Sequence, residues 1–162
     1  HGFNFAESLW FATGDGNTFK VEPEITDIEV DGAWVKVEGL QIKTGEAVTL
    51  EVTPVEITPD VLKSSLIASE GTSDASGYTM LESKERIEAG DYVDDLAYVG
   101  TKTTGEPIIV VIERALCTSG LELAGSNKEK VVPTLTFEGV SQISGSHRTV
   151  PYKIYYPTQA QG

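Results

Sequence analysis

The sequence has a single cysteine, Cys117, so no disulfide can form within the chain and its core must be held by burial alone. Cys117 stands between Leu116 and Thr118 in a strand-like stretch, where a small buried hydrophobic residue is expected. A nucleophilic thiol would need an activating base, and neither of the two histidines, His1 and His147, is placed for that role.

Clusters of basic residues are also missing. The net charge is −13, which disfavours direct binding of nucleic acid through its phosphates. The acids are unevenly placed: up to Asp60 there are 12 acids and 3 bases. One interpretation is a soluble surface that repels itself, and the other is an acidic wall facing a polyanion that must pass without sticking.

Long apolar runs are absent, the longest being Ile108 to Ile112, so no membrane helix is expected. The chain starts at His1 without a charged leader, which predicts no secretory signal. The motifs of serine hydrolases, phosphate-binding loops and zinc proteases do not occur. Paired carboxylates for glycoside cleavage stay open, because any acidic protein offers such pairs. We therefore expect no catalytic residue, no cofactor and no metal.

What the sequence does contain is many short strands separated by glycine turns. Asp31-Gly32 lies between the alternating runs Ile25–Val30 and Trp34–Glu38, which predicts a hairpin with a two-residue loop. Thr44-Gly45 predicts a second turn, before a strand over Ala47–Glu56 in which Val48, Leu50 and Val52 share the buried face. Five consecutive β-branched residues in Ile108–Glu113 predict a strand covered on both faces.

One helix is expected over Pro59–Ser69, capped by Thr58 and ended by Gly71. The remaining strands are predicted at Tyr78–Leu81, Leu96–Gly100, Thr134–Glu138 and Tyr152–Tyr156. The predicted fold class is mainly β, a sandwich or barrel of antiparallel strands with one flanking α-helix, in a single domain over 1–162 with a loose tail at 158–162.

Three acidic groups resemble sites. Asp15-Gly16-Asn17 predicts a turn rather than a calcium loop, because later ligands are missing. Asp91, Asp94 and Asp95 predict a solvated loop, with an inter-subunit or cation contact as the alternative. In the third group, Asp27, Glu29 and Asp31 are expected on one exposed strand face. The tryptophans, Trp10 and Trp34, suit a core or an interface, with sugar stacking as the alternative.

The chain resembles the major tail tube proteins of long-tailed, siphophage-type bacteriophages from about Thr18 to Pro157. The resemblance is carried by four segments in order: VTLEVTPVEITPDVLKSSL (Val48–Leu66), DDLAYVGTKTTGEPIIVVIERALCTSGLEL (Asp94–Leu123), KEKVVPTLTFEGV (Lys128–Val140) and PYKIYYP (Pro151–Pro157). It implies a β-sandwich or barrel with one helix and a long projecting hairpin or loop. Residues 1–17 match no family pattern and would form an extension or an arm between rings.

The resemblance also implies a function without catalysis. Copies of the chain would form rings, usually of six, that stack into a conduit for DNA in the virion tail, after synthesis and assembly in the host cytoplasm. The implied partners are the chain itself, tail terminator, tape measure and baseplate or tip proteins, with transiting DNA not tightly bound and no membrane. The acids expected to line the lumen are Asp27, Glu29, Asp31, Glu38, Glu46 and Glu51. The alternative is an extracellular adhesion or carbohydrate-binding β-sandwich, and the third possibility is an acidic hydrolase.

Overall fold

The computed structural model describes residues 12–14, 16–123, 133–142 and 149–158. These residues form a mainly β fold with one α-helix, which confirms the predicted fold class. The elements are β1 (Thr18–Asp27), β2 (Gln41–Val52), α1 (Pro59–Leu66), β3 (Ala68–Gly71), β4 (Met80–Ser83), the 3₁₀ helix η1 (Ala89–Asp91), β5 (Val93–Thr101), β6 (Pro107–Cys117), β7 (Leu135–Gly139) and β8 (Tyr152–Tyr155).

Six strands belong to one sheet, in the order β1-β2-β7-β6-β5, and β8 pairs with β6 beside this path. The strands β3 and β4 form a separate two-stranded sheet. By its internal contacts the chain divides into two compact units. Unit 1 comprises residues 1–19, 50–92 and 116–137, and unit 2 comprises residues 20–49, 93–115 and 138–162.

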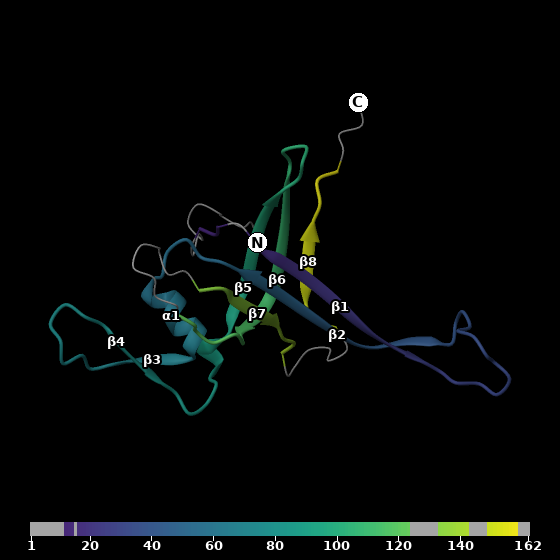
Figure 1. The fold of residues 1–162 in the computed structure, drawn as a ribbon, viewed down its shortest axis with the longest axis horizontal. Coiled ribbons are helices and arrows are strands. Elements are labelled where there is room, and N and C mark those ends of the chain that lie inside the picture. Colours follow the sequence, from purple (N-terminus) through teal and green to yellow (C-terminus); the bar gives the residue numbers. More distant parts are fainter. Residues whose placement is uncertain (1–11, 15, 124–132, 143–148, 159–162) are drawn as a thin grey trace. The chain divides into compact units, whose positions relative to one another are not determined.

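In unit 2, β6 is paired on both sides by antiparallel neighbours. The register of β5 places Val99 opposite Ile109, and the register of β8 places Tyr155 opposite the same Ile109. Figure 1 shows β5, β6 and β8 side by side in that arrangement. At the centre of β6, Val110, Val111 and Ile112 are all buried, so this part of the strand is covered on both faces as predicted.

In unit 1, the helix α1 begins where the sequence predicts. The backbone N–H of Val61 donates to the hydroxyl of Thr58 at 3.3 Å, and Pro59 occupies the first turn, where its missing N–H costs nothing. The predicted end at Ser69 with Gly71 as the stop is wrong. The helix ends at Leu66 because Ile67 adopts a left-handed conformation with φ 51°, and Gly71 lies in β3 instead. Ile67 then accepts a hydrogen bond from the backbone of Lys84, next to β4, at 3.3 Å.

The buried side chains follow the predicted alternation on two strands. Val48, Leu50 and Val52 on β2 are buried, while Glu51 between them is exposed. On β7, Leu135 and Phe137 are fully buried, which confirms their predicted inward direction. The strand expected over Ala47–Glu56 stops at Val52, although Pro54 still forms an isolated bridge with Thr13.

The predicted turn at Thr44-Gly45 is wrong, because β2 runs through it without a break. A Cβ atom on Gly45 would lie 2.9 Å from a carboxylate oxygen of Glu24. The glycine therefore makes room for a side chain of the neighbouring strand, which is a second common reason for glycine within a strand.

The last strand, β8, is shorter than predicted and has no fully buried face. It ends at Tyr155, and Ile154 and Tyr156 are both at least half exposed, so the expected alternation of Tyr152, Ile154 and Tyr156 does not mark a core face. Among the described residues, no helix has the length and apolar character needed to cross a membrane.

Candidate interaction surface at the tip of the β1–β2 hairpin

The strands β1 and β2 form a long hairpin whose far end, residues 28–40, we call the tip (Figure 1). The backbone N–H of Ile28 donates to the carbonyl of Leu40 at 2.7 Å and closes the tip at its base. Two turns shape it: Ala33 N–H donates to Val30 O, and Leu40 N–H donates to Val37 O, each at 3.2 Å. The tip is therefore a broad loop with two corners.

Glycine makes both corners. Gly32 and Gly39 have φ values of 90° and 85°, a region that residues with a Cβ atom rarely adopt. Asp31 is not among the positive-φ residues, so the Asp31-Gly32 corner has the pattern of a type II turn rather than the predicted tight hairpin loop. As a result β1 ends at Asp27 and Trp34–Glu38 forms no strand, which corrects both predictions.

The tip exposes large apolar side chains. Trp34 is 96% exposed and Val35 is 78% exposed. Ile28, Val30 and Val37 are each more than two fifths exposed. A folded chain seldom leaves so many neighbouring apolar groups in water, and such groups usually mark a site of association. Trp34 is therefore not a core residue of this chain, which leaves the predicted interface role or the sugar-stacking alternative.

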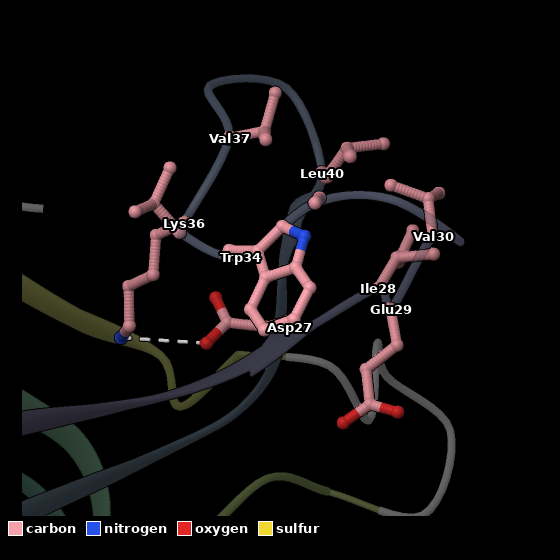
Figure 2. A pocket seen from close by; sticks show the side chains of 10 residues that line it. Asp27, Ile28, Glu29, Val30, Trp34, Lys36, Val37 and Leu40 are labelled. Carbon is pink, nitrogen blue, oxygen red and sulfur yellow. Dashed lines mark ion pairs between the residues drawn. The ribbon is translucent and has the colours of Figure 1, made fainter.

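A hollow of about 330 Å³ lies within the tip. Figure 2 shows its lining, which combines the apolar side chains with Asp27, Glu29 and Lys36. The carboxylate of Asp27 accepts a hydrogen bond from Gln41 at 2.7 Å and pairs with Lys36 at 3.3 Å. The hydrogen bond from Gln41 and the charge of Lys36 lower the pKa of Asp27, so this acid stays ionised.

The structure brings four of the six candidate lumen acids to the tip or its base, namely Asp27, Glu29, Asp31 and Glu38. The first three do not share a strand face as predicted, because the strand ends at Asp27 and the other two lie in the loop. Glu46 and Glu51 lie on β2, away from the tip loop. Glu46 is nearly buried and forms an ion pair with Lys43, whereas Glu51 is exposed on the face opposite Leu50.

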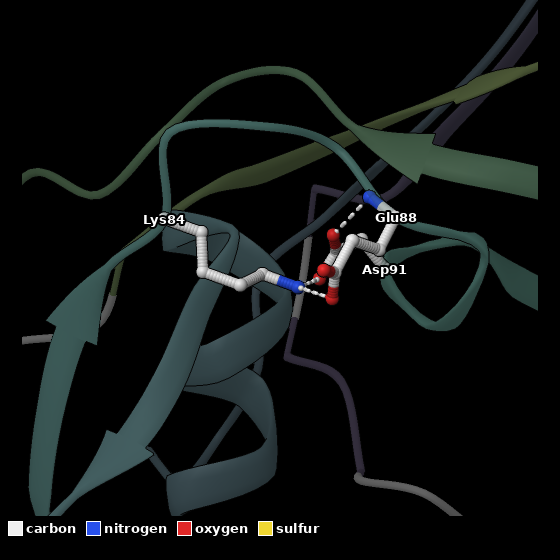
Figure 3. A network of polar contacts seen from close by, with 3 residues as sticks. All are labelled: Lys84, Glu88 and Asp91. Carbon is white, nitrogen blue, oxygen red and sulfur yellow. Dashed lines mark hydrogen bonds and ion pairs between the residues drawn. The ribbon is translucent and has the colours of Figure 1, made fainter.

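The acidic segment around Asp91 is not the solvated loop that the sequence predicts. Lys84 lies 2.5 Å from Asp91 and 3.2 Å from Glu88, and the backbone N–H of Glu88 donates to Asp91 at 2.7 Å (Figure 3). The Asp91 side chain is only 9% exposed. Burial raises its pKa, but the hydrogen bonds from Lys84 and Glu88 outweigh this and the pKa is lowered. The hydrogen bond from Asp91 in turn raises the pKa of Lys84.

The other two acids of that group have separate surroundings. Asp94 pairs with Arg114 across β5 and β6 at 2.5 Å. Asp95 is exposed and adopts a positive φ of 52°, which aspartate tolerates better than most residues. In the described part of the chain, no group of three or more histidine, cysteine, aspartate or glutamate side chains is arranged to hold a metal ion.

Of the remaining sequence candidates, Cys117 is buried as predicted, with its sulfur 3.6 Å from the hydroxyl of Ser119. Asn17 joins two segments of unit 1: its amide nitrogen donates to Thr13 and Gly14, and its oxygen accepts from the backbone of Thr53. Asp15 and Trp10 lie outside the described residues.

The sequence analysis missed the tip as a unit. The signal was present, because Asp31-Gly32 and Glu38-Gly39 are two glycine turns seven residues apart, and this spacing favours a loop with two corners over a strand. Compared with known proteins, the chain matches no protein-family model, and a search of curated proteins found no significant match.

Proposed function

We propose that this chain is a structural subunit of a phage tail tube, which self-assembles into stacked rings that enclose a conduit for DNA. The observation that carries the proposal is the exposed apolar tip of the β1–β2 hairpin, led by Trp34 and Val35. Covering these side chains would remove apolar surface from water, at roughly 25 cal/mol per Å². A contact between copies would provide that cover.

The edges of the sheet also support self-association. The strands β1 and β5 stand at the two ends of the strand order, so each is bordered by a sheet strand on one side only. An uncovered edge strand is a template for pairing with another chain. Identical copies that pair edge to edge around an axis would close a ring, while a head-to-tail contact through the tip would extend the stack.

The charge of the chain agrees with the proposed conduit. Glu29, Asp31 and Glu38 at the tip and Glu51 on β2 are exposed. DNA carries about one negative charge per 1.7 Å of its axis, so an acidic wall would repel it and let it pass without binding. The proposed partners are other copies of the chain and the tail proteins that cap, measure and anchor the tube.

The exposure of Trp34 favours a second candidate function of a different class. An exposed indole beside the polar side chains of Asp27 and Lys36 is a surface on which a sugar ring can stack. The second candidate is therefore an extracellular adhesion or carbohydrate-binding module. It predicts single copies that bind glycans, whereas the first predicts rings or tubes.

Negative-stain electron microscopy of Trp34→Ser distinguishes the two functions. The matched control is Tyr78→Ser, because Tyr78 is also a large exposed aromatic residue, at 76% exposure, and lies in a loop outside the tip. We expect rings or tubes from the wild type and from Tyr78→Ser, and isolated subunits from Trp34→Ser. Isolated wild-type subunits that bind a glycan array through Trp34 would replace the first proposal by the second. Isolated subunits without glycan binding would contradict both.

A further inference from the structure

The last described segment, residues 150–157, is held against unit 2 in the manner of a bound peptide, and we call it the C-terminal arm. Its first contact is a notch at Gly139, at the end of β7. A Cβ atom on Gly139 would lie only 2.6 Å from a methyl carbon of Val150 and 3.1 Å from Ile112. The missing side chain therefore creates the space into which Val150 of the arm packs.

The middle of the arm is held through its backbone. The N–H of Glu113 donates to the carbonyl of Pro151 at 3.0 Å. Four residues of β8 then pair antiparallel with Ile109–Ile112 of β6. Addition of a short extended strand to a sheet edge is a common way for one protein to bind a segment of another, with the backbone bonds giving affinity and side-chain pockets giving specificity.

Two charged contacts fasten the arm along its length. Lys153 of the arm pairs with Glu113 of β6 at 2.5 Å. Near the other end, the ammonium of Lys102 lies 4.5 Å from the centre of the Tyr156 ring, and Glu106 holds the same ammonium at 3.0 Å. Val150, Lys153 and Tyr156 thus each have a specific receiving group on unit 2.

The arm nevertheless buries little of itself. Ile154, Tyr155 and Tyr156 remain 50%, 54% and 62% exposed. The arm's hold on unit 2 therefore depends on edge pairing and point contacts, which another copy of the same segment can make equally well. When identical segments are exchanged between copies, each contact is lost once and regained once, so concentration and the connecting chain decide the balance.

We propose that the receiving site formed by Gly139, the Ile109–Ile112 edge of β6, Glu113 and Lys102 also binds the C-terminal arm of a second copy. Exchange of arms then joins copies covalently continuous with different neighbours. This contact is separate from the tip contact, so arm exchange and tip-mediated assembly succeed or fail independently.

Cysteine trapping tests the exchange directly. Ile109 and Tyr155 are directly opposite in the register, and residues so paired have Cα atoms about 4.5–5.5 Å apart, which suits a disulfide. In a Cys117→Ala background, one chain carries Ile109→Cys and another carries Tyr155→Cys. The two chains are mixed at high concentration, oxidised and separated on a non-reducing gel. We expect a cross-linked pair at least about tenfold above a control mixture of Ile109→Cys with Tyr78→Cys.

A single chain with both Ile109→Cys and Tyr155→Cys should form the disulfide internally when dilute, which checks the register. If this internal disulfide forms while the mixed chains cross-link no more than the control mixture, exchange is excluded. A missing internal disulfide would also overturn the proposal, because the receiving site would then be wrongly placed. In either case normal rings from the wild type would leave the proposed tube function standing.

A charge exchange gives a second measurement that does not depend on cysteine variants. Glu113→Lys and Lys153→Glu each place like charges across the arm contact within one chain. Mixed together, each arm finds its opposite charge on the other chain. Mixed pairs should exceed self-pairs by roughly fivefold, a factor that falls in high salt because the pair is partly exposed. Equal amounts of mixed and self-pairs at low salt would contradict arm exchange.

Discussion

The two ends of the β1–β2 hairpin have the same sequence pattern and opposite surroundings. Val48, Leu50 and Val52 alternate with polar residues on β2 and are buried, whereas Ile28 and Val30 alternate with acids at the tip and are exposed. The difference is in the neighbours, because β2 lies between β1 and β7, while the tip is a loop turned by two glycines. Alternation thus identifies an apolar face, and only the tertiary structure shows whether the chain covers it. The proposed assembly contact is the face left uncovered.

The largest expected effect is at the buried end. Leu50→Asp removes a side chain that is only 1% exposed and places a charge in its space without a partner. We expect a loss of more than about 4 kcal/mol in the free energy of unfolding, enough to abolish folding or assembly. Circular dichroism and urea titration measure it, with Glu51→Gln as the neighbouring control on the exposed face. A folded, assembling Leu50→Asp protein would contradict the burial of this strand face.

A smaller effect is expected where the C-terminal arm meets β7. Gly139→Ala forces a methyl group against Val150, Ile112 and Val48, all within 3.3 Å of the new atom. Overpacking of this kind costs about 1–3 kcal/mol. The control is Gly90→Ala, where nothing lies within 4 Å and φ is not positive, so the change should be neutral or slightly stabilising. Urea titrations compare the two. Equal stabilities would show that the notch at Gly139 is not filled.

These contrasts also show what the sequence can and cannot predict. The start of α1 was predictable, since Thr58, Pro59 and Asp60 act through contacts within one turn. Its end was not, because Ile67 adopts a left-handed conformation that its side chain disfavours, where the chain turns to pair β3 with β4. Gly45 looks like a turn residue in sequence, and only its closeness to Glu24 explains it as a strand residue.

The candidate site was predictable in part. The acids and the Asp31-Gly32 corner stand out in the sequence, but the exposure of Trp34 depends on the second corner at Gly39 and on the absence of a covering strand. The ion pair of Asp27 with Lys36 joins β1 to the tip loop, and the Lys84 contact with Asp91 joins residues seven apart. No local pattern indicates either partner, so both acids looked equally solvated.

An intermediate effect with a pH dependence is expected at Asp91. Its folded pKa is lowered from 3.8, so the stabilisation is fully present above that value and is lost as the pH falls through the folded pKa. The pKa of Lys84 is raised from 10.5, so its contribution is present below that value and is lost at still higher pH. Asp91→Asn should therefore lower the melting temperature at neutral pH, and the difference from the wild type should shrink below about pH 4.

Glu88→Gln is the matched control for Asp91→Asn, because Glu88 contacts the same lysine from a side chain that is 71% exposed. Its effect should be much smaller, since exposed ion pairs contribute little. Differential scanning calorimetry from pH 3 to pH 8 measures both variants. A difference for Asp91→Asn that stays constant over this range would show that the ionised carboxylate does not stabilise the fold.

The smallest effect on stability, and the sharpest on the proposed function, is expected for acids exposed at both ends of the hairpin. Glu29 lies at the tip and Glu51 on the outer face of β2, so changing both to lysine should cost within about 0.5 kcal/mol at each site. Tubes should still form. DNA ejection should slow and become sensitive to salt, because each new lysine–phosphate contact adds roughly one unit to the salt dependence. The measurement is an ejection assay across ionic strengths, with Glu85→Lys as a control acid outside the candidate set. If ejection is unchanged in tubes of normal appearance, Glu29 and Glu51 do not face the lumen, and the uncovered tip then acts in assembly alone.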